Sequence, residues 1–432
     1  MSDSLVYRLS AELAKVRFVD PHSHINPLSP ASRSLADMLG YHYYTELVHS
    51  AGISRDAIEG QSVSEEERIT NIVEGLSRLS NTIQYQWLLE ISRELFGFKE
   101  ASIRPDNWRA LADLVTSSCR LPEWESTVLA RNNMEAVFLT NDFDDLLSGF
   151  DTSRYVPCLR VDELVFHSSR PGVLDRLSSV TGIVPSSSRQ LEQSITCLTE
   201  RFVRAGARAA AISLPPNFRP ERIDDSVADR AIEEIRSRGE ESSLDARDII
   251  ARHMFWVVAG SCNVMHLPFD LMIGVRRGVY PGGVYQGQDL LDGRLSLADY
   301  APLFNAFPKV VFPVSVLSHP LNHELTAFAW IFPNVMPFGH WWYANTPTVI
   351  ERDLEQRIEA VPRTKLLGYY SDMYKLEFGY PKFAMYRRVL SRVLARRFVL
   401  ERNWSEEAAL DLGVDLLARN TRRIFYGSET VS

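Results

Sequence analysis

Eight short runs of apolar or β-branched residues recur along this chain of 432 residues, and most of them end at polar, Gly or Pro residues. Helix-like stretches lie between most of these runs, for example 189–205 and 245–258. Short strands that alternate with helices are typical of a parallel sheet, and eight such units predict a (β/α)8 TIM barrel. The expected strands are Val16–Val19, Ala136–Thr140, Tyr155–Val161, Ala209–Leu214, Val264–Ile273, Val310–Ser318, Asn334–Phe338 and Leu366–Tyr370.

The connection after the first expected strand is far longer than the others. More than a hundred residues separate Val19 from Ala136, whereas one crossover unit needs only about 30. Apolar residues at three-to-four spacing predict helices over 65–79, 84–96 and 106–118. We therefore expect a single barrel domain over 1–432 with a helical insertion or cap subdomain at 45–130. This insertion either forms a lid over the barrel mouth or serves as scaffolding or a subunit contact.

Two histidines follow the first expected strand. His22 and His24 are two residues apart, and alternate side chains of an extended segment point to the same side, so both rings can face one ion. Neutral imidazole is a common ligand of zinc and similar metals. Taken alone, the pair equally suits two solvated loop histidines.

Polar residues after the other strands are candidate partners, because the carboxyl ends of barrel strands converge. Two histidines, a carboxylate and a nearby third imidazole form the kind of catalytic metal site that keeps one position open. Asp372 is either that carboxylate or the cap of a following helix. The residues selected in this way are His22, His24, Asn141, Asp142, Arg160, Asp162, Met272, His319, His340, Trp341, Trp342 and Asp372.

Composition narrows the class of protein. A hydrophobic content of 45% and a charged content of 24% are typical of a soluble globular protein. The net charge of −8 gives no general attraction to nucleic acid, and no apolar run approaches the roughly 18 residues of a membrane helix. The four cysteines form no Cys-x-x-Cys pair, and the amino terminus has no secretory pattern. We expect a cytoplasmic homo-oligomer without nucleic acid or membrane partners.

Several segments, in a shared order, resemble motifs of the uronate isomerases (glucuronate isomerases) of the amidohydrolase superfamily. His22-Ser23-His24 resembles the superfamily's His-x-His, and Tyr41-His42-Tyr43-Tyr44 is similar to the family's Asp-His-Tyr-Lys-Trp-Arg. The other matching segments are Thr140–Leu146, Pro157–Asp162, Gly339–Asn345, and Asp372 with Tyr386-Arg387-Arg388. The resemblance runs over most of the chain and implies a barrel of the metal-dependent amidohydrolase type.

This resemblance implies a metal-assisted aldose–ketose isomerisation of a sugar acid such as D-glucuronate or D-galacturonate. The reaction needs a base that removes the C2 proton, stabilisation of an enediolate, and return of a proton at C1. Asp372 is either that base or a metal ligand, and His42, Tyr43 and Lys375 are further catalytic candidates. Arg160 and Arg277 suit the substrate carboxylate, and Trp341 and Trp342 suit a wall against the sugar, although a lone arginine or tryptophan equally suits a surface ion pair or the core.

Two departures from the family pattern affect the metal and the substrate. Met272 stands where the family has a strand-five histidine, and a thioether is a poor ligand for a hard divalent ion. His319 is the expected substitute ligand beside His22, His24 and Asp372. The arginine of the family's Asp-Ser-Arg is missing, and Lys375 replaces it if one residue is inserted. We expect a loosely held divalent metal, either zinc or manganese.

Two other functions fit the same residues. One is a metal-dependent hydrolase or decarboxylase of the same superfamily that acts on another small carboxylate. The other is a barrel that has lost catalysis and binds a ligand or partner. Met272 favours these two alternatives, whereas the two arginines and the Trp341-Trp342 pair favour the isomerase.

Overall fold

The strands form one curved parallel arrangement in the computed structural model, which describes residues 2–427. One sheet has the order β1-β2-β3 and a second has the order β10-β9-β6-β5-β4, with every pair parallel. A bridge between Asn141 and Leu159 joins the two sheets. The strands are β1 Phe18–Asp20, β2 Met134–Phe138, β3 Tyr155–Val156, β4 Cys158–Arg160, β5 Ala209–Leu214, β6 Phe269–Ile273, β9 Phe312–Val316 and β10 Val335–Pro337.

The ring closes through the segment 366–372. A parallel bridge joins Phe338, just after β10, to Leu367. On the other side of this segment, the amide of Asp372 donates to the carbonyl of His22 at 3.2 Å. These contacts place an eighth strand-like segment between β10 and β1, so the prediction of a (β/α)8 barrel is confirmed.

Three expected strands differ in detail. Pro157 divides the expected strand 155–161 into β3 and β4, because proline has no amide hydrogen for the ladder. The expected start of strand five at Val264 is wrong: helix α13 continues to Met265, and His266 ends it in a left-handed conformation. The segment 366–370 makes only the single bridge at Leu367.

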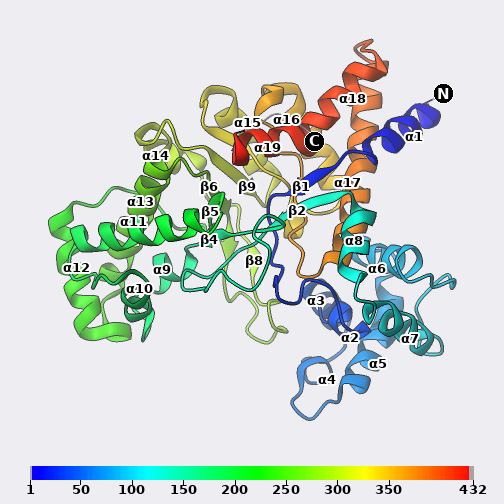
Figure 1. Cartoon of the computed structure of the whole chain (residues 1–432), viewed down its shortest axis with the longest axis horizontal. Coiled ribbons are helices and arrows are strands. Elements are labelled where there is room, and N and C mark those ends of the chain that lie inside the picture. Colours follow the sequence, from blue (N-terminus) through cyan, green and yellow to red (C-terminus); the bar gives the residue numbers. More distant parts are fainter. Residues whose placement is uncertain (1, 428–432) are drawn as a thin grey trace.

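Helices surround the barrel, as Figure 1 shows, and they pack on its outer side or follow its strands. An antiparallel pair of short strands, β7 Val275–Arg276 and β8 Leu290–Leu291, leaves the ring after β6 and carries the segment 277–289, called here the β7–β8 loop. The helices are α1 Ser2–Leu13, α2 Leu35–Leu39, α3 His42–Ser50, α4 Arg55–Glu59, α5 Glu65–Leu76, α6 Ile83–Glu94, α7 Trp108–Cys119, α8 Trp124–Asn132, α9 Asp162–His167, α10 Val173–Thr181, α11 Ser188–Arg204, α12 Asp225–Arg238, α13 Leu244–Met265, α14 Ala301–Ala306, α15 His319–Ile331, α16 Pro347–Ala360, α17 Gly379–Val393, α18 Glu406–Val414 and α19 Asn420–Tyr426.

Helices α2 to α8 lie between β1 and β2, and α2 to α7 gather on one side of the barrel, coloured blue to teal in Figure 1. Buried Glu377 ties this group to the barrel. Its carboxylate accepts hydrogen bonds from the indole of Trp124 at 2.9 Å and from the amide of Ser32 at 3.0 Å. The insertion is therefore anchored at both of its ends.

Two apolar clusters form the core. One joins β1 and β2 to α1, α17 and the insertion, and the other fills the space between β4, β5, β6 and β9 and helices α11 to α15. In the described part of the chain, no helix combines the length and apolar character needed to cross a membrane. Burial of this kind at about 25 cal/mol per Å² of apolar surface is the main stabilising contribution to the fold.

Gly339, at the end of β10, tests how tightly the barrel mouth is packed. Its φ is +47°, and a Cβ at this position would lie 2.1 Å from the ring of Tyr370, which is fully buried. Gly172 also has a positive φ, +79°, but a Cβ there would meet nothing within 4 Å.

We predict that Gly172→Ala lowers the free energy of unfolding by about 1 kcal/mol, the usual cost of a left-handed alanine. Gly339→Ala should cost roughly 2 kcal/mol more, because overpacking adds to the backbone term. Urea unfolding midpoints of the two variants measure the difference. Equal losses would show that Tyr370 moves aside freely.

Candidate active site

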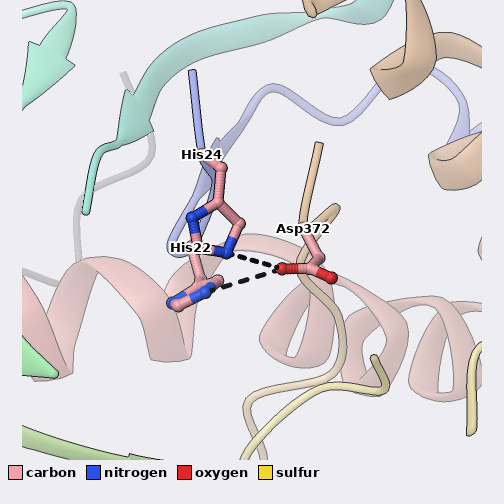
Figure 2. Close-up of side chains that lie close together, drawn as sticks. All are labelled: His22, His24 and Asp372. Atoms are coloured by element: carbon pink, nitrogen blue, oxygen red, sulfur yellow. Dashed lines mark ion pairs between the residues drawn. The ribbon is translucent and has the colours of Figure 1, made fainter. Parts of the chain in front are cut away.

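His22 and His24 lie immediately beyond β1 and share a face with Asp372, as Figure 2 shows. Asp372 Oδ1 lies 3.2 Å from His24 Nε2 and 3.7 Å from His22 Nε2. The two imidazole rings meet edge to face, with centroids 5.3 Å apart. Residues 350 positions apart in sequence therefore present three ligand-type atoms to one point.

Asp372 stands in a constrained turn. Its φ is +53°, a region that non-glycine residues seldom adopt and that costs on the order of 1–3 kcal/mol. The amide of Asp372 donates to the carbonyl of His22, and the hydroxyl of Tyr41 donates to the carbonyl of Asp372 at 2.9 Å. The buried ammonium of Lys382 donates to Tyr41 Oη and to the carbonyl of Ser371, both at 2.7 Å. These bonds hold the strained turn in place.

The three side chains fit a divalent metal ion. One atom from each of His22, His24 and Asp372 lies within 4.8 Å of the others. His22 Nε2 and Asp372 Oδ1 are buried and lack a hydrogen-bond partner among the described residues. Buried polar atoms normally have a partner, so two that face one another in this way suit an ion. Three protein ligands with an open position are typical of catalytic rather than structural sites.

The Nδ1 atoms of both histidines also contact polar side chains. His22 Nδ1 lies 3.3 Å from the buried carboxylate of Asp270 in β6, and His24 Nδ1 lies 2.8 Å from the hydroxyl of Thr140. Such outer contacts fix the tautomer and the orientation of metal-ligating imidazoles. They leave the Nε2 atoms of both rings directed at Asp372.

Burial and neighbouring charges shift the pKa values of Asp372, His24 and His22 in different directions. Burial alone would raise the pKa of Asp372, but the close contact with His24 and the charges of His24, His22 and Lys382 outweigh burial and lower it to about 2. Burial lowers the pKa of His24 despite its contact with Asp372. Burial also opposes charge on His22, yet the carboxylates of Asp270, Asp372 and Asp20 together outweigh this effect and raise the pKa of His22. The carboxylate is thus ionised, as a metal ligand must be.

A cavity of about 160 Å³ lies beside this group. It brings together eight of the residues singled out from the sequence and adds six that were not. The predicted residues that line it are His24, His42, Arg160, Met272, Arg277, Trp341, Trp342 and Asp372, and the added ones are Glu46, Ser213, Val275, Gln286, Asp289 and Tyr374.

Both arginines of the cavity are already paired with acids. Arg160 Nε lies 3.2 Å from Asp162, and Arg277 Nη1 lies 2.6 Å from Asp289. Burial lowers the pKa of His42 to about 3 against the opposing charge of Asp372, so its imidazole is neutral near pH 7. His42 Nδ1 is also buried without a partner among the described residues.

Three of the predicted catalytic or metal-binding residues lie elsewhere. His319 is not in the group of His22, His24 and Asp372, because its Nδ1 bonds to Asp353 at 2.9 Å at the start of α15. The ammonium of Lys375 donates to the carbonyls of Ser29 and Ala31 and lines an adjoining cavity.

Tyr43 does not line the small cavity, and its buried hydroxyl has no partner among the described residues. Its ring packs against that of His42 at 4.3 Å and lies under the ammonium of Lys382. Tyr43 therefore stands behind His42 rather than beside Asp372.

The residues that sequence reasoning missed differ in how visible they are. Asp270 is a lone acid inside the apolar run 267–273, and a buried charge needs a partner, so its position was a usable signal. Lys382 and Glu46 stand on helices where charged residues are ordinary, and no pattern distinguishes them. Met272 lines the cavity, as its place in the expected strand indicated, whereas His266 is exposed at the end of α13.

The β7–β8 loop covers the cavity and contacts the insertion. Tyr280 Oη lies 3.2 Å from His49 Nε2 on α3, and the amide of Tyr285 donates to the carboxylate of Glu59 on α4 at 2.5 Å. Gln286 donates to the hydroxyl of Tyr374 at 3.2 Å, and the ring of Tyr374 stacks on His24. Two segments outside the barrel ring thus meet over the mouth.

Comparison with known proteins adds evidence about the family. No family model matches the sequence. A curated uronate isomerase of Rhizorhabdus wittichii is 23% identical over 444 residues, which span 95% of this chain and 93% of that protein. The crystal structure of glucuronate isomerase from Caulobacter crescentus aligns with a TM-score of 0.89 at 19% identity, covering 100% of this chain and 95% of that one. A protein from Lactobacillus casei described as a metal-dependent hydrolase aligns with a TM-score of 0.57 at 12% identity over 97% of both chains.

The barrel carries a His-His-Asp group with ligand atoms suited to a divalent metal. The similarity along nearly the whole sequence supports a divergent member of the uronate isomerase family. The resemblance inferred from the motifs is therefore confirmed.

Asp270 and Asp353 allow a matched test of the metal ligands, since each carboxylate holds one histidine. We predict that Asp270→Asn weakens binding of Zn²⁺ or Mn²⁺ by about 10–100-fold, the usual effect of losing an outer contact to a ligand histidine. Asp353→Asn should leave the affinity unchanged, because His319 lies outside the group. Calorimetric titration of the metal-free protein gives both affinities, and an equal loss in the two variants would restore His319 as a ligand.

Proposed function

We propose that this protein isomerises a hexuronate, D-glucuronate or D-galacturonate, to the corresponding ketouronate. One observation carries the proposal: two arginines line the same cavity as His24 and Asp372 of the His-His-Asp group, in a chain that is similar to a curated uronate isomerase over 95% of its length. A substrate with a carboxylate at one end and a reactive carbonyl at the other needs both features in one cavity. The hydrolase and lapsed-enzyme alternatives rest on Met272 alone.

Arg160 and Arg277 bind the substrate carboxylate in this proposal. Guanidinium groups match a carboxylate with two parallel hydrogen bonds, and their existing partners Asp162 and Asp289 fix the orientation of each fork. The ring faces of Trp341 and Trp342, which are both buried, form a wall of the cavity. Aromatic surfaces of this kind pack against the C–H faces of a sugar chain.

Proton transfer between C2 and C1 falls to residues around Asp372. Its carboxylate is ionised at neutral pH and serves either as the base at C2 or as a metal ligand. Neutral His42 donates a hydrogen bond to a substrate oxygen or accepts one from a substrate hydroxyl. The ring of Tyr43 packs against the ring of His42 and supports it. When bound by His22, His24 and Asp372, a divalent ion, zinc or manganese, supplies Lewis acidity toward the substrate oxygens. Lys375 is placed outside this mechanism, since carbonyl oxygens already hold its ammonium.

The net charge also bears on the partners and the location that we propose for this protein. We propose a cytoplasmic homo-oligomer whose partner is a small sugar acid and which binds neither nucleic acid nor membranes. A net charge of −8 supports the exclusion of nucleic acid, because phosphate binding depends on basic patches. Light scattering of the purified protein measures the oligomeric state directly.

The activity is tested with D-glucuronate and D-galacturonate, following the ketose product with and without chelator and added Zn²⁺ or Mn²⁺. We expect ketose from one of these substrates, and loss of activity on chelation that either ion restores. Absence of ketose under every metal condition would contradict the proposed function.

Arg160 and Arg170 provide a matched pair for the carboxylate contact. Arg160 lines the cavity that holds His24, whereas Arg170 lines only the adjoining one. We predict that Arg160→Met raises KM for the uronate by about 10–100-fold, because a charge-assisted hydrogen bond is lost. Arg170→Met should leave KM unchanged. Steady-state kinetics of both variants decides the matter, and a normal KM in Arg160→Met would remove this arginine from substrate binding.

A further inference from the structure

Glu46 is the least explained polar group of the small cavity. It stands on α3 four residues after His42, so one helical turn places both side chains on the same face, and both line the cavity. The sequence motifs assign no role to this residue.

The carboxyl group of Glu46 is buried at one oxygen without compensation. Oε1 has no hydrogen-bond partner, and Glu46 forms no ion pair among residues 2–427. Burial, together with the nearby charge of Asp289, raises the pKa of Glu46 to about 8. A group in this state is a neutral carboxylic acid that can both donate and accept a hydrogen bond.

The surrounding structure holds Glu46 in place. A Cβ on Gly287 of the β7–β8 loop would come within 2.8 Å of Glu46 Cγ, so the loop backbone passes close against the side chain. The cavity that Glu46 lines is the one shared by Arg277, His24 and Asp372. An unpaired buried polar atom costs about 1–3 kcal/mol unless something bonds to it. In a ligand cavity, the ligand supplies that bond.

We propose that Glu46 is a specificity-determining residue that hydrogen-bonds a hydroxyl group of the substrate's carbon chain. The inference rests on the proposed function in one respect, because it takes the ligand to be a polyhydroxy monocarboxylate. Arg160 and Arg277 recognise the carboxylate, and Glu46 recognises the hydroxylated chain beside it. A site built around such a bond discriminates against analogues that lack the hydroxyl, since the buried group is then left unpaired.

The test uses D-gluconate, a six-carbon polyhydroxy carboxylate that has no aldehyde to isomerise. Its affinity for the full-length protein is measured by calorimetry in the unsubstituted protein and in Glu46→Gln, Glu46→Leu and Glu46→Asp. Glu46→Gln keeps both hydrogen-bonding functions and should bind within about 3-fold of the parent, whereas Glu46→Leu should bind roughly 10–100-fold more weakly. Glu46→Asp, which withdraws the carboxyl by one methylene, should also weaken binding and serves if the leucine variant does not fold.

A control separates cavity effects from general effects of losing a carboxylate. Glu74→Leu changes an exposed acid of α5 in the same insertion and should bind gluconate as the parent does. With the uronate substrate, Glu46→Leu should raise KM far more than it lowers kcat. The inference would be overturned if Glu46→Leu bound gluconate as the parent does, or if Glu46→Asp did so where the leucine variant does not fold. Failure of the parent to bind gluconate would also overturn it.

The outcome is independent of turnover. If the parent forms no ketose but the Glu46 variants lose gluconate affinity as described, the isomerase proposal fails and the hydroxyl-binding role stands. If ketose forms and the Glu46 variants bind gluconate as the parent does, the isomerase proposal stands and the hydroxyl-binding role fails.

Discussion

The closure of the barrel between β1 and the segment 366–372 is the contact on which the site depends. Asp20, fully buried at the end of β1, accepts hydrogen bonds from the amide and hydroxyl of Ser371. Two residues further on, the backbones of His22 and Asp372 bond to each other. Because His22, His24 and Asp372 come from the two ends of the chain and meet at this seam, their shared geometry depends on closure of the ring. Burial raises the pKa of Asp20 to about 6, although its bonds to Ser371 oppose the shift.

Much of the fold could be predicted because the strand pattern is strong. Runs such as 209–214 and 312–316 are apolar at all but one position and almost wholly buried, as expected for strands covered on both faces. Boundaries failed where local chemistry overrode the pattern: Pro157 interrupted one strand, and the apolar end of α13 read as the beginning of another. Barrel topology then placed residues with no sequence proximity, such as His24, Arg160 and Asp372, at one mouth.

The candidate site was less predictable, since pairing between side chains is not written in one sequence. His319 follows a strand as a ligand should, yet Asp353 on the next helix engages it. Lys375 lies three residues from Asp372, but a turn with positive φ at Asp372 sends it toward Ser29. Asp270 stands two residues before Met272 and contacts His22 Nδ1. Strand β6 therefore supports the His-His-Asp group through His22 and adds no side chain of its own to that group.

The meeting of the β7–β8 loop with helices α3 and α4 has an evolutionary consequence. The ligand-bearing ends of β1 and the 366–372 segment belong to the ring, whereas Glu46, Gln286 and Asp289 belong to two excursions that the ring does not need for closure. Changes in those excursions alter what the cavity recognises while the reactive centre keeps its geometry. Since the excursions touch through Tyr280 and His49, a change on one side alters the surface that the other must match. Substrate preference in such a barrel would therefore evolve through matched substitutions in both segments, not through single substitutions.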